Sequence, residues 1–124
     1  MVVFDSNIIV DILRQKRSAL NLIDAYLAKE KLAITIVNEY EVLRGFREKD
    51  ENVVSELLRQ FVVYKLEDSA ITEAVKTYKK LAEKGKMVSE LDIFIAGIVF
   101  ANNETLVTRD KDFLNLENPR IIVV

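Results

Sequence analysis

Short apolar runs alternate along this chain with longer stretches whose apolar residues recur at helical spacing. The short runs are apolar or β-branched throughout, as strands buried on both faces of a sheet require. Strands that alternate with helices are typical of a mostly parallel sheet. The pattern therefore predicts an α/β fold, with three α/β/α layers around a five-stranded sheet. The expected strands are residues 2–5, 32–37, 62–66, 105–108 and 121–124.

Polar residues stand where several of the helical patterns begin, and their side chains can cap a helix by accepting a hydrogen bond from a free backbone N–H. The expected N-caps are Ser6, Ser18, Asn38 and Ser89. A further helical stripe covers 53–61, and a long amphipathic helix is expected over 68–84, where Gly85 can end it. No linker or repeat interrupts residues 1–124, which predicts a single domain.

The composition removes most of the usual catalytic groups. The chain has no Cys and no His, which excludes thiolate nucleophiles, disulfides, Cys- or His-ligated zinc and hydrolases that use His as a base. Its 18 Lys and Arg against 20 Asp and Glu give a formal net charge of −2, without the basic excess of many nucleic-acid binders. Chemistry here must use carboxylates, Lys, Tyr, hydroxyls or a metal ion held by oxygen ligands.

Acidic residues stand where α/β proteins bind ligands, beyond the carboxyl ends of the strands, either directly after a predicted strand or in the first turn of a predicted helix. They are Asp5, Glu41, Asp92, Asp110 and Asp112. Crowded carboxylates repel one another unless a cation neutralises them. Hard oxygen ligands suit Mg²⁺ or Mn²⁺, and such an ion lowers the pKa of a bound water and stabilises charge on a phosphate. We expect the acids to gather into one cation-holding cup, which is consistent with metal-dependent phosphodiester hydrolysis.

Each of these acids also has a purely structural explanation. Asp5 can cap the first helix in competition with Ser6, and Asp110 and Asp112 can be ordinary turn residues. A capping box, in which an acid three positions after the cap bonds back to the cap amide, explains two more. The pairs that match it are Asn38 with Glu41 and Ser89 with Asp92.

Four short blocks occur in order along most of the chain. They are FDSNIIVDILR at 4–14, EVLRG at 41–45, DIFIAG at 92–97 and LVTRDKDF at 106–113. Together they resemble the PIN domain family, and more closely its VapC-type toxins of toxin–antitoxin pairs. The resemblance implies a doubly wound sheet, a Mg²⁺- or Mn²⁺-dependent endoribonuclease, a homodimer and a VapB-like antitoxin as partner.

Carried over by position, the resemblance also implies site residues. The metal-binding and catalytic set is Asp5, Glu41, Asp92 and Asp110, and the secondary set is Asp112, Glu90, Ser6, Asn7 and Thr108. One position departs from the family, in which the Glu often lies three residues after a strand-end Thr. Here Glu41 lies six residues after Thr35, and Glu39 lies four after it. Gly45 favours Glu41, and Glu39 stays open.

RNA would have to approach an acidic pocket on a protein of net charge −2. Arg14 and Arg44 are the best candidates for phosphate contacts, because they lie on helices that carry site acids, and Arg109 beside Asp110 is a third. Few phosphate contacts predict weak non-specific binding and selectivity for structured RNA.

The first two helices carry more apolar residues than a small core requires. These can form a homodimer contact or a groove for an antitoxin helix, or they can all belong to the core. They include Ile9, Leu13, Leu20, Ile23, Tyr26 and Leu27. The start of the chain shows no targeting signal, and the longest apolar run, 93–101, is too short to cross a bilayer. A cytoplasmic protein with no membrane partner is expected.

Two other functions suit the same residues. A PIN-like module that binds RNA or protein without cleaving could keep the acids, although a binding module has no need to hold four acids together. A metal-dependent phosphatase could use a similar sheet, and it would prefer small phosphate monoesters.

Overall fold

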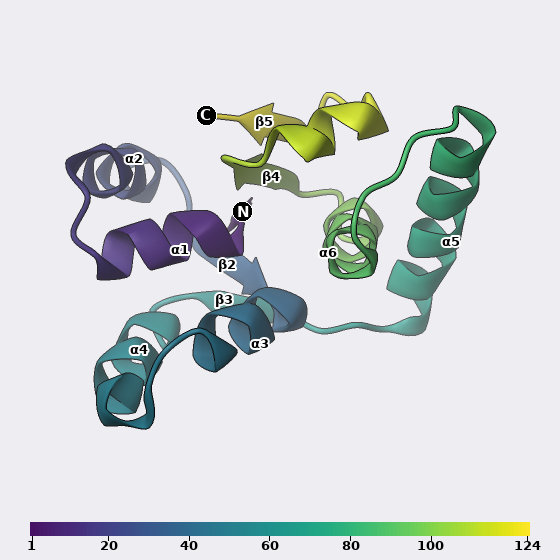
Figure 1. Ribbon diagram of the computed structural model, residues 1–124. Coiled ribbons are helices and arrows are strands. Elements are labelled where there is room, and N and C mark those ends of the chain that lie inside the picture. The colour runs from purple at the N-terminus through teal and green to yellow at the C-terminus, as the bar shows by residue number, and fades with distance from the viewer.

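The computed structural model describes residues 1–124, which form an α/β structure (Figure 1). The strands are β1 Val2–Phe4, β2 Leu32–Thr35, β3 Val62–Tyr64, β4 Thr105–Thr108 and β5 Ile121–Val123. The α-helices are α1 Ser6–Leu13, α2 Arg17–Leu27, α3 Ile36–Arg44, α4 Glu51–Leu58, α5 Asp68–Glu83 and α6 Glu90–Ala101. Two 3₁₀ helices, η1 Glu48–Asp50 and η2 Lys111–Leu116, complete the set.

All five strands are parallel and lie in the order β3-β2-β1-β4-β5. β1 is central, with Val3 opposite Ala33 of β2 and Leu106 of β4. The chain builds outward from β1 to β3 on one side and then crosses to β4 and β5 on the other. The strand order therefore reverses between β1 and β4, and in open sheets of this kind ligands bind beyond the carboxyl ends of the strands at such a point.

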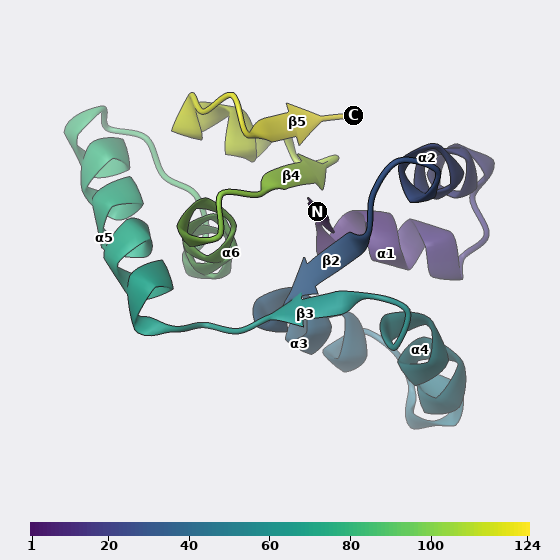
Figure 2. The same ribbon diagram turned by 180° about the vertical axis from the view of Figure 1, so that it is seen from behind.

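Helices cover both faces of the sheet (Figures 1 and 2). Successive side chains of a strand point to opposite faces, so Val2 and Phe4 pack in one core with α1, α2 and α4, while Val3 packs in the other with α5 and α6. Both cores are apolar, which accounts for strands that are apolar throughout. The predicted three-layer α/β/α fold is confirmed, and the sheet is parallel from edge to edge.

The first two predicted N-caps are wrong. Asp5, not Ser6, caps α1, and its Oδ1 accepts a hydrogen bond of 2.8 Å from the backbone N of Ser6. α2 begins at Arg17 after Lys16, which makes no side-chain cap, so Ser18 lies inside the first turn. α1 therefore starts one residue earlier than predicted, because the chain turns into the helix directly after the strand, and α2 starts two residues earlier.

The third predicted N-cap is wrong for a similar reason. β2 ends at Thr35, two residues before the predicted end, because Ile36 and Val37 already belong to α3. Thr35 caps this helix, and Asn38 occupies the third helical position and completes a capping box with Thr35. The box that paired Asn38 with Glu41 is therefore not formed. Ser89 caps α6 as predicted.

Gly97 permits the close packing of α5 against α6. A Cβ atom at this position would lie 2.6 Å from the carbonyl oxygen of Ala70 and 2.9 Å from the Cβ of Ala74. These distances are shorter than van der Waals contact, so only glycine allows the two helices to approach so closely. α6 is thereby held against its neighbour while its first turn faces the carboxyl edge of the sheet.

Most of the apolar residues of the first two helices belong to the core. Ile9 is fully buried, and Leu13, Leu20, Ile23 and Tyr26 are partly buried against the same cluster. Leu27, by contrast, is 58% exposed. None of the helices combines the length and the apolar character needed to cross a lipid bilayer.

Candidate active site

Asp5 lies at the carboxyl end of the central strand, where the strand order reverses, and is only 4% exposed. Its Oδ1 accepts hydrogen bonds from the backbone N of Ser6 at 2.8 Å and from Nδ2 of Asn38 at 3.1 Å. Its Oδ2 accepts a 2.6 Å bond from the Thr108 hydroxyl and a long contact of 3.4 Å from Nδ2 of Asn7. Because that last contact is long, Oδ2 keeps capacity for a further partner.

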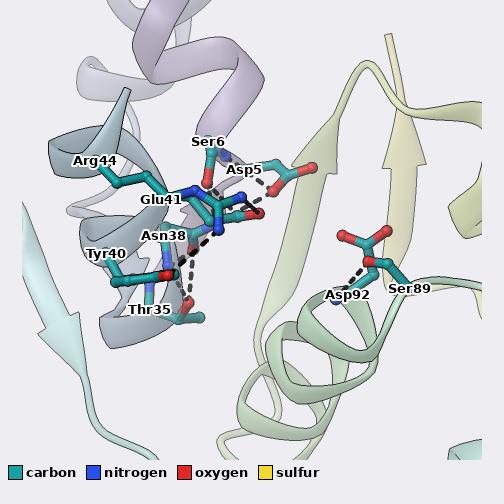
Figure 3. Close-up of polar contacts among 9 residues, drawn as sticks. All are labelled: Asp5, Ser6, Thr35, Asn38, Tyr40, Glu41, Arg44, Ser89 and Asp92. Carbon is teal, nitrogen blue, oxygen red and sulfur yellow. Dashed lines mark hydrogen bonds and ion pairs between the residues drawn. The ribbon is translucent and has the colours of Figure 1, made fainter. Parts of the chain in front are cut away.

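Asn38 joins the ends of β1 and β2 and is fully buried. Its Oδ1 accepts from the backbone N of Thr35 at 2.9 Å and from the Thr35 hydroxyl at 2.8 Å. Its Nδ2 donates to Oδ1 of Asp5 at 3.1 Å and to Oγ of Ser6 at 2.9 Å. All four hydrogen-bonding positions of the amide are used, so its orientation is fixed by the network (Figure 3).

Glu41 enters the site from α3. The Ser6 hydroxyl accepts from Asn38 and donates to Oε1 of Glu41 at 2.7 Å. Oε2 of Glu41 lies 3.9 Å from Nη2 of Arg44, whose guanidinium lies over the ring of Tyr40 at 5.0 Å from the centroid. The carboxylate of Glu41 is thus held by one short hydrogen bond on the inner side, with an arginine on the outer side (Figure 3).

The two candidate acids of α3 point to different surfaces. Residues two apart on a helix lie about 200° apart around its axis, so they cannot both face the same site. Glu41 faces Ser6 and Asp5, whereas Glu39 lines a separate hollow beside β3 and α4 together with Arg59. The structure therefore brings Glu41, and not Glu39, to the site.

Asp92 lies in the first turn of α6, across from Asp5 and Glu41 (Figure 3). Its backbone N donates to the Ser89 hydroxyl at 3.2 Å, and the carboxylate joins no ion pair. Burial raises the pKa of Asp92 to about 6, the hydrogen bond with Ser89 acts against that rise, and the charges of Asp5, Asp110 and Glu41 add to it.

The end of β4 supplies Thr108 and Asp110. The Thr108 hydroxyl, which donates to Asp5, also accepts from the backbone N of Asp110 at 3.0 Å. Asp110 caps η2, with its Oδ1 accepting from the backbone N of Asp112 at 2.9 Å. Asp112 is exposed, and its role in this contact is through its backbone alone.

The site is short of positive charge. Neither Asp5, Asp92 nor Asp110 takes part in an ion pair. Burial raises the pKa of Asp5 above its ordinary value, hydrogen bonds, chiefly from Thr108, oppose the rise, and the charges of Glu41 and Asp110 add to it. A cation bound among these carboxylates would remove both the desolvation and the repulsion penalties.

The carboxylates do not, however, form one ligand cluster. No three of the acidic side chains lie close enough together to hold a single metal ion as they stand. The expectation of one cation-holding cup is corrected accordingly: the four acids share one edge of the sheet and feel one another's charge, but they do not share a coordination sphere. The reason is that like charges repel, and hydrogen bonds hold Asp5 and Glu41 where they are.

The donor set still fits a hard divalent cation. Every candidate ligand is a carboxylate oxygen, and Oδ2 of Asp5 and Oε2 of Glu41 retain acceptor capacity. Mg²⁺ keeps several of its own waters and needs only one or two carboxylates as direct ligands. The residues present therefore suit a hydrated ion better than one enclosed by protein ligands.

The remaining predicted residues lie at varying distances from this centre. Glu90 lines an apolar groove between α5 and α6 with Val75 and Phe94, apart from the acids. Arg14 and Arg44 are exposed. The guanidinium of Arg109 lies against a buried acid of α1 instead of facing outward. Contact of these three arginines with RNA stays a prediction.

Asn38 is the site residue that the sequence reasoning missed. A polar residue three positions after a strand-end Thr, within a run of buried apolar residues, is a signal that could have found it. A buried amide must find partners for all its polar atoms, and the strand end that precedes it faces the site. The buried Asn38 was therefore a candidate for bonding the acids at that edge.

The chain has known relatives. The family model described as the PIN domain matches residues 2–119, and the chain therefore belongs to the PIN domain family. It is 25% identical over 111 residues to ribonuclease VapC1 of Methanocaldococcus jannaschii, an alignment that covers 89% of this chain and 76% of the relative.

Solved structures show the same fold. VapBC2 from Rickettsia felis, bound to a DNA fragment from its promoter, matches with a TM-score of 0.84 and 23% identity over 100% of this chain and 98% of that one. A toxin–antitoxin complex from Klebsiella pneumoniae matches with a TM-score of 0.85 and 21% identity, over 99% of this chain and 97% of that one.

Proposed function

We propose that the chain is a VapC-type endoribonuclease that hydrolyses RNA phosphodiester bonds with Mg²⁺ or Mn²⁺ and acts as the toxin of a toxin–antitoxin pair. The observation that carries the proposal is a buried, hydrogen-bonded Asp5 at the reversal of strand order, with three more acids around it and no cation paired to it. Membership of the PIN domain family and the likeness to a ribonuclease support the same reaction.

A hydrated metal ion would be held among Asp5, Glu41, Asp92 and Asp110, with one or two of these carboxylates as direct ligands and the others bonded to its waters. Once bound, such an ion supplies Lewis acidity, which activates water as a nucleophile and stabilises charge on the phosphate. Asn38 and Thr108 keep the Asp5 carboxylate oriented, because each donates a hydrogen bond to a different oxygen. That fixed orientation lowers the cost of assembling the site when substrate arrives.

Glu41 is the candidate for orienting the attacking water. The Ser6 hydroxyl fixes its Oε1, while Oε2 accepts no hydrogen bond from the protein and can accept one from water. A carboxylate can take a proton in this way when no histidine is available. Arg44, exposed and beside Glu41, is suited to contact an RNA phosphate, as is the exposed Arg14 at the end of α1.

The proposal extends to partners and compartment. We propose a VapB-like antitoxin, a homodimer and a cytoplasmic location. The similar solved structures from Rickettsia felis and Klebsiella pneumoniae are VapBC and toxin–antitoxin complexes, which supports the first of these. An apolar groove of about 320 Å³ between α5 and α6, flanked by the exposed side chains of Ile71, Val75 and Tyr78, supports a contact with a second copy.

The test is cleavage by protein purified free of any antitoxin. Structured and total RNA are incubated with wild type and Asp5→Asn in Mg²⁺, in Mn²⁺ and in EDTA. We expect cleavage by wild type in the presence of either metal only. Failure of wild type to cut any RNA with either ion contradicts the enzymatic proposal.

Two further assays separate the alternatives. Metal-dependent release of phosphate from a small monoester, with no RNA cleavage, would indicate a phosphatase. RNA binding without cleavage would indicate a non-catalytic module.

A further inference from the structure

Arg109 lies between two site residues in the sequence and contacts α1 through both its backbone and its side chain. It separates Thr108, which donates to Asp5, from Asp110. Its backbone N donates to Oδ1 of Asn7 at 3.2 Å. Its side chain runs along α1 to Asp11, where Nε lies 2.9 Å from Oδ2. The segment 108–110 is therefore held against α1, the helix that follows Asp5.

The two attachment points lie on one face of α1. Asn7 and Asp11 are four residues apart, so their side chains lie one turn above the other. A further hydrogen bond of 3.0 Å from Nη2 of Arg109 to the Ser18 hydroxyl adds a contact from the start of α2. Three separate contacts thus fix a single arginine, which leaves little freedom for the backbone of residues 108–110.

The contacts continue from Asn7 into the acids. Nδ2 of Asn7 lies 3.4 Å from both Oδ2 of Asp5 and the hydroxyl oxygen of Thr108. A continuous chain of polar contacts therefore leads from Asp11 through Arg109 and Asn7 to Asp5. A displacement of Arg109 would therefore move two acids of the site. It would act on Asp5 through Asn7 and on Asp110 through the backbone.

Burying the charge of Asp11 costs free energy. The residue is 9% exposed, and its charge is balanced by Arg109 on one oxygen and by Lys16, 3.2 Å away, on the other. A buried ion pair often contributes no more stability than apolar residues of the same size, but it does demand one geometry. A fixed geometry at Arg109 also fixes the position of Asp110, which follows it in the chain.

We propose that Asp11 and Arg109 are positioning residues, whose ion pair sets the place of Asn7 and Asp110 in the site. The inference rests on the proposed nuclease function for its kinetic consequence, but not for its structural one. On this proposal Arg109 acts inward, through Asp11, and its effect on cleavage does not come from contact with RNA.

The alternatives predict different kinetics. If Arg109 binds RNA phosphate, its removal raises KM and weakens RNA binding, while removal of the acid Asp11 does neither. If the pair is only structural, both variants lower the melting temperature but leave kcat of the folded protein unchanged. A positioning pair lowers kcat through either partner, and the two losses do not add.

The experiment compares Asp11→Asn, Arg109→Gln, the double variant and Arg109→Lys. We expect Asp11→Asn and Arg109→Gln each to lower kcat roughly 10- to 100-fold, with KM within about twofold of wild type. The kcat of the double variant should be no lower than that of the less active single variant. Arg109→Lys should recover part of the loss in kcat. The matched control is Arg59→Gln, which breaks an exposed ion pair with Glu56 on α4. A rise in KM confined to Arg109→Gln, or unchanged kcat in both single variants, overturns the proposal.

A second measurement does not depend on nuclease activity. In ¹H–¹⁵N spectra of the protein, Asp11→Asn is expected to shift the side-chain amide of Asn7 and the backbone amide of Asp110, and to speed hydrogen exchange at the Arg109 amide that donates to Asn7. Arg59→Gln should leave these signals in place. Unchanged signals in Asp11→Asn overturn the proposal even if the wild-type protein proves inactive, and changed signals sustain it in that case.

Discussion

The two sides of the site hold their acids in different ways (Figure 3). On the side of α1 and α3, Asp5 and Glu41 accept short hydrogen bonds from Thr108 and Ser6, and Asn38 links them. On the side of α6, Asp92 has Ser89 as its hydrogen-bonding partner, and its pKa is raised to about 6. The carboxylates of Asp5 and Glu41 are thus held in place by hydrogen bonds from the protein. The carboxylate of Asp92 has no such network and no cationic partner.

The difference has a physical reason. Asp5 and Asn38 are buried, so each polar atom left without a partner there would cost free energy, and the network satisfies them. Asp92 is half-buried and can still face water, which reduces the penalty for leaving it unpaired. Variants on the first side should therefore disturb an existing structure, whereas variants on the second should show mainly in the response to a cation.

Asp5→Asn is expected to have the largest effect. It keeps the shape and the helix cap but removes the charge, so cleavage should fall roughly 1,000-fold, equivalent to about 4 kcal/mol in activation free energy. Single-turnover rates on a labelled RNA would measure it. Asp24→Asn, at an exposed aspartate of α2, is the control and should keep wild-type activity; near-normal cleavage by Asp5→Asn would show that the buried acid is not needed.

Glu41→Gln should follow, with a loss of roughly 100-fold, because the amide cannot accept a proton from water. Glu39→Gln is the matched variant, two positions away on the same helix and outside the site. Its cleavage rate should equal that of wild type in the same assay. Equal losses in both variants would contradict the assignment of Glu41.

Asn38→Ala should destabilise the fold as well as the site. It removes one of the donors to the buried Asp5 and the acceptor of the buried Thr35 hydroxyl, so we expect the free energy of unfolding to fall by about 2–3 kcal/mol. Urea denaturation would measure this change. Asn21→Ala, an exposed asparagine of α2, should change stability by less than about 0.5 kcal/mol, and a similarly small effect at Asn38 would show that the network does not support the fold.

Asp92→Asn should raise the stability of the metal-free protein by roughly 1–2 kcal/mol near pH 8, a figure reduced for the partial exposure of the group. The folded pKa of about 6 exceeds the ordinary value of 3.8, so the folded state takes up a proton first as the pH falls. The penalty of the charged group is therefore full above about pH 7, shrinks as the pH falls through 6, and is lost below the unfolded pKa of 3.8. Urea denaturation of both proteins across this range would follow the difference.

The response to Mg²⁺ provides a further comparison of wild type with Asp92→Asn. An ion that binds only the folded state stabilises it in proportion to the logarithm of its concentration, so wild type should gain more from Mg²⁺ than Asp92→Asn does. Thermal melts in EDTA and in Mg²⁺ would show the order of the two proteins reverse. Equal gains in both would indicate that Asp92 does not take part in metal binding.

The strands and the acids could be predicted because they depend on local patterns. Residues 105–108 are β4 as expected, since a short β-branched run between helical segments has few other structures open to it. The caps were less predictable. Whether Asp5 or Ser6 begins α1 depends on where the strand turns into the helix, and sheet pairing decides that point from outside the segment.

Local patterns in the sequence were enough to predict the layered α/β fold and to place four acids at one edge of a mostly parallel sheet, because strand and helix periodicity are short-range features. The strand order β3-β2-β1-β4-β5 is not such a feature. Long-range contacts establish that Glu41 faces Asp5, that Asn38 donates to Asp5, and that Arg109 turns inward to Asp11. These contacts join residues 33 to 98 positions apart or depend on the direction of one side chain on a helix. Such features are set by packing across the sheet, which no local pattern encodes.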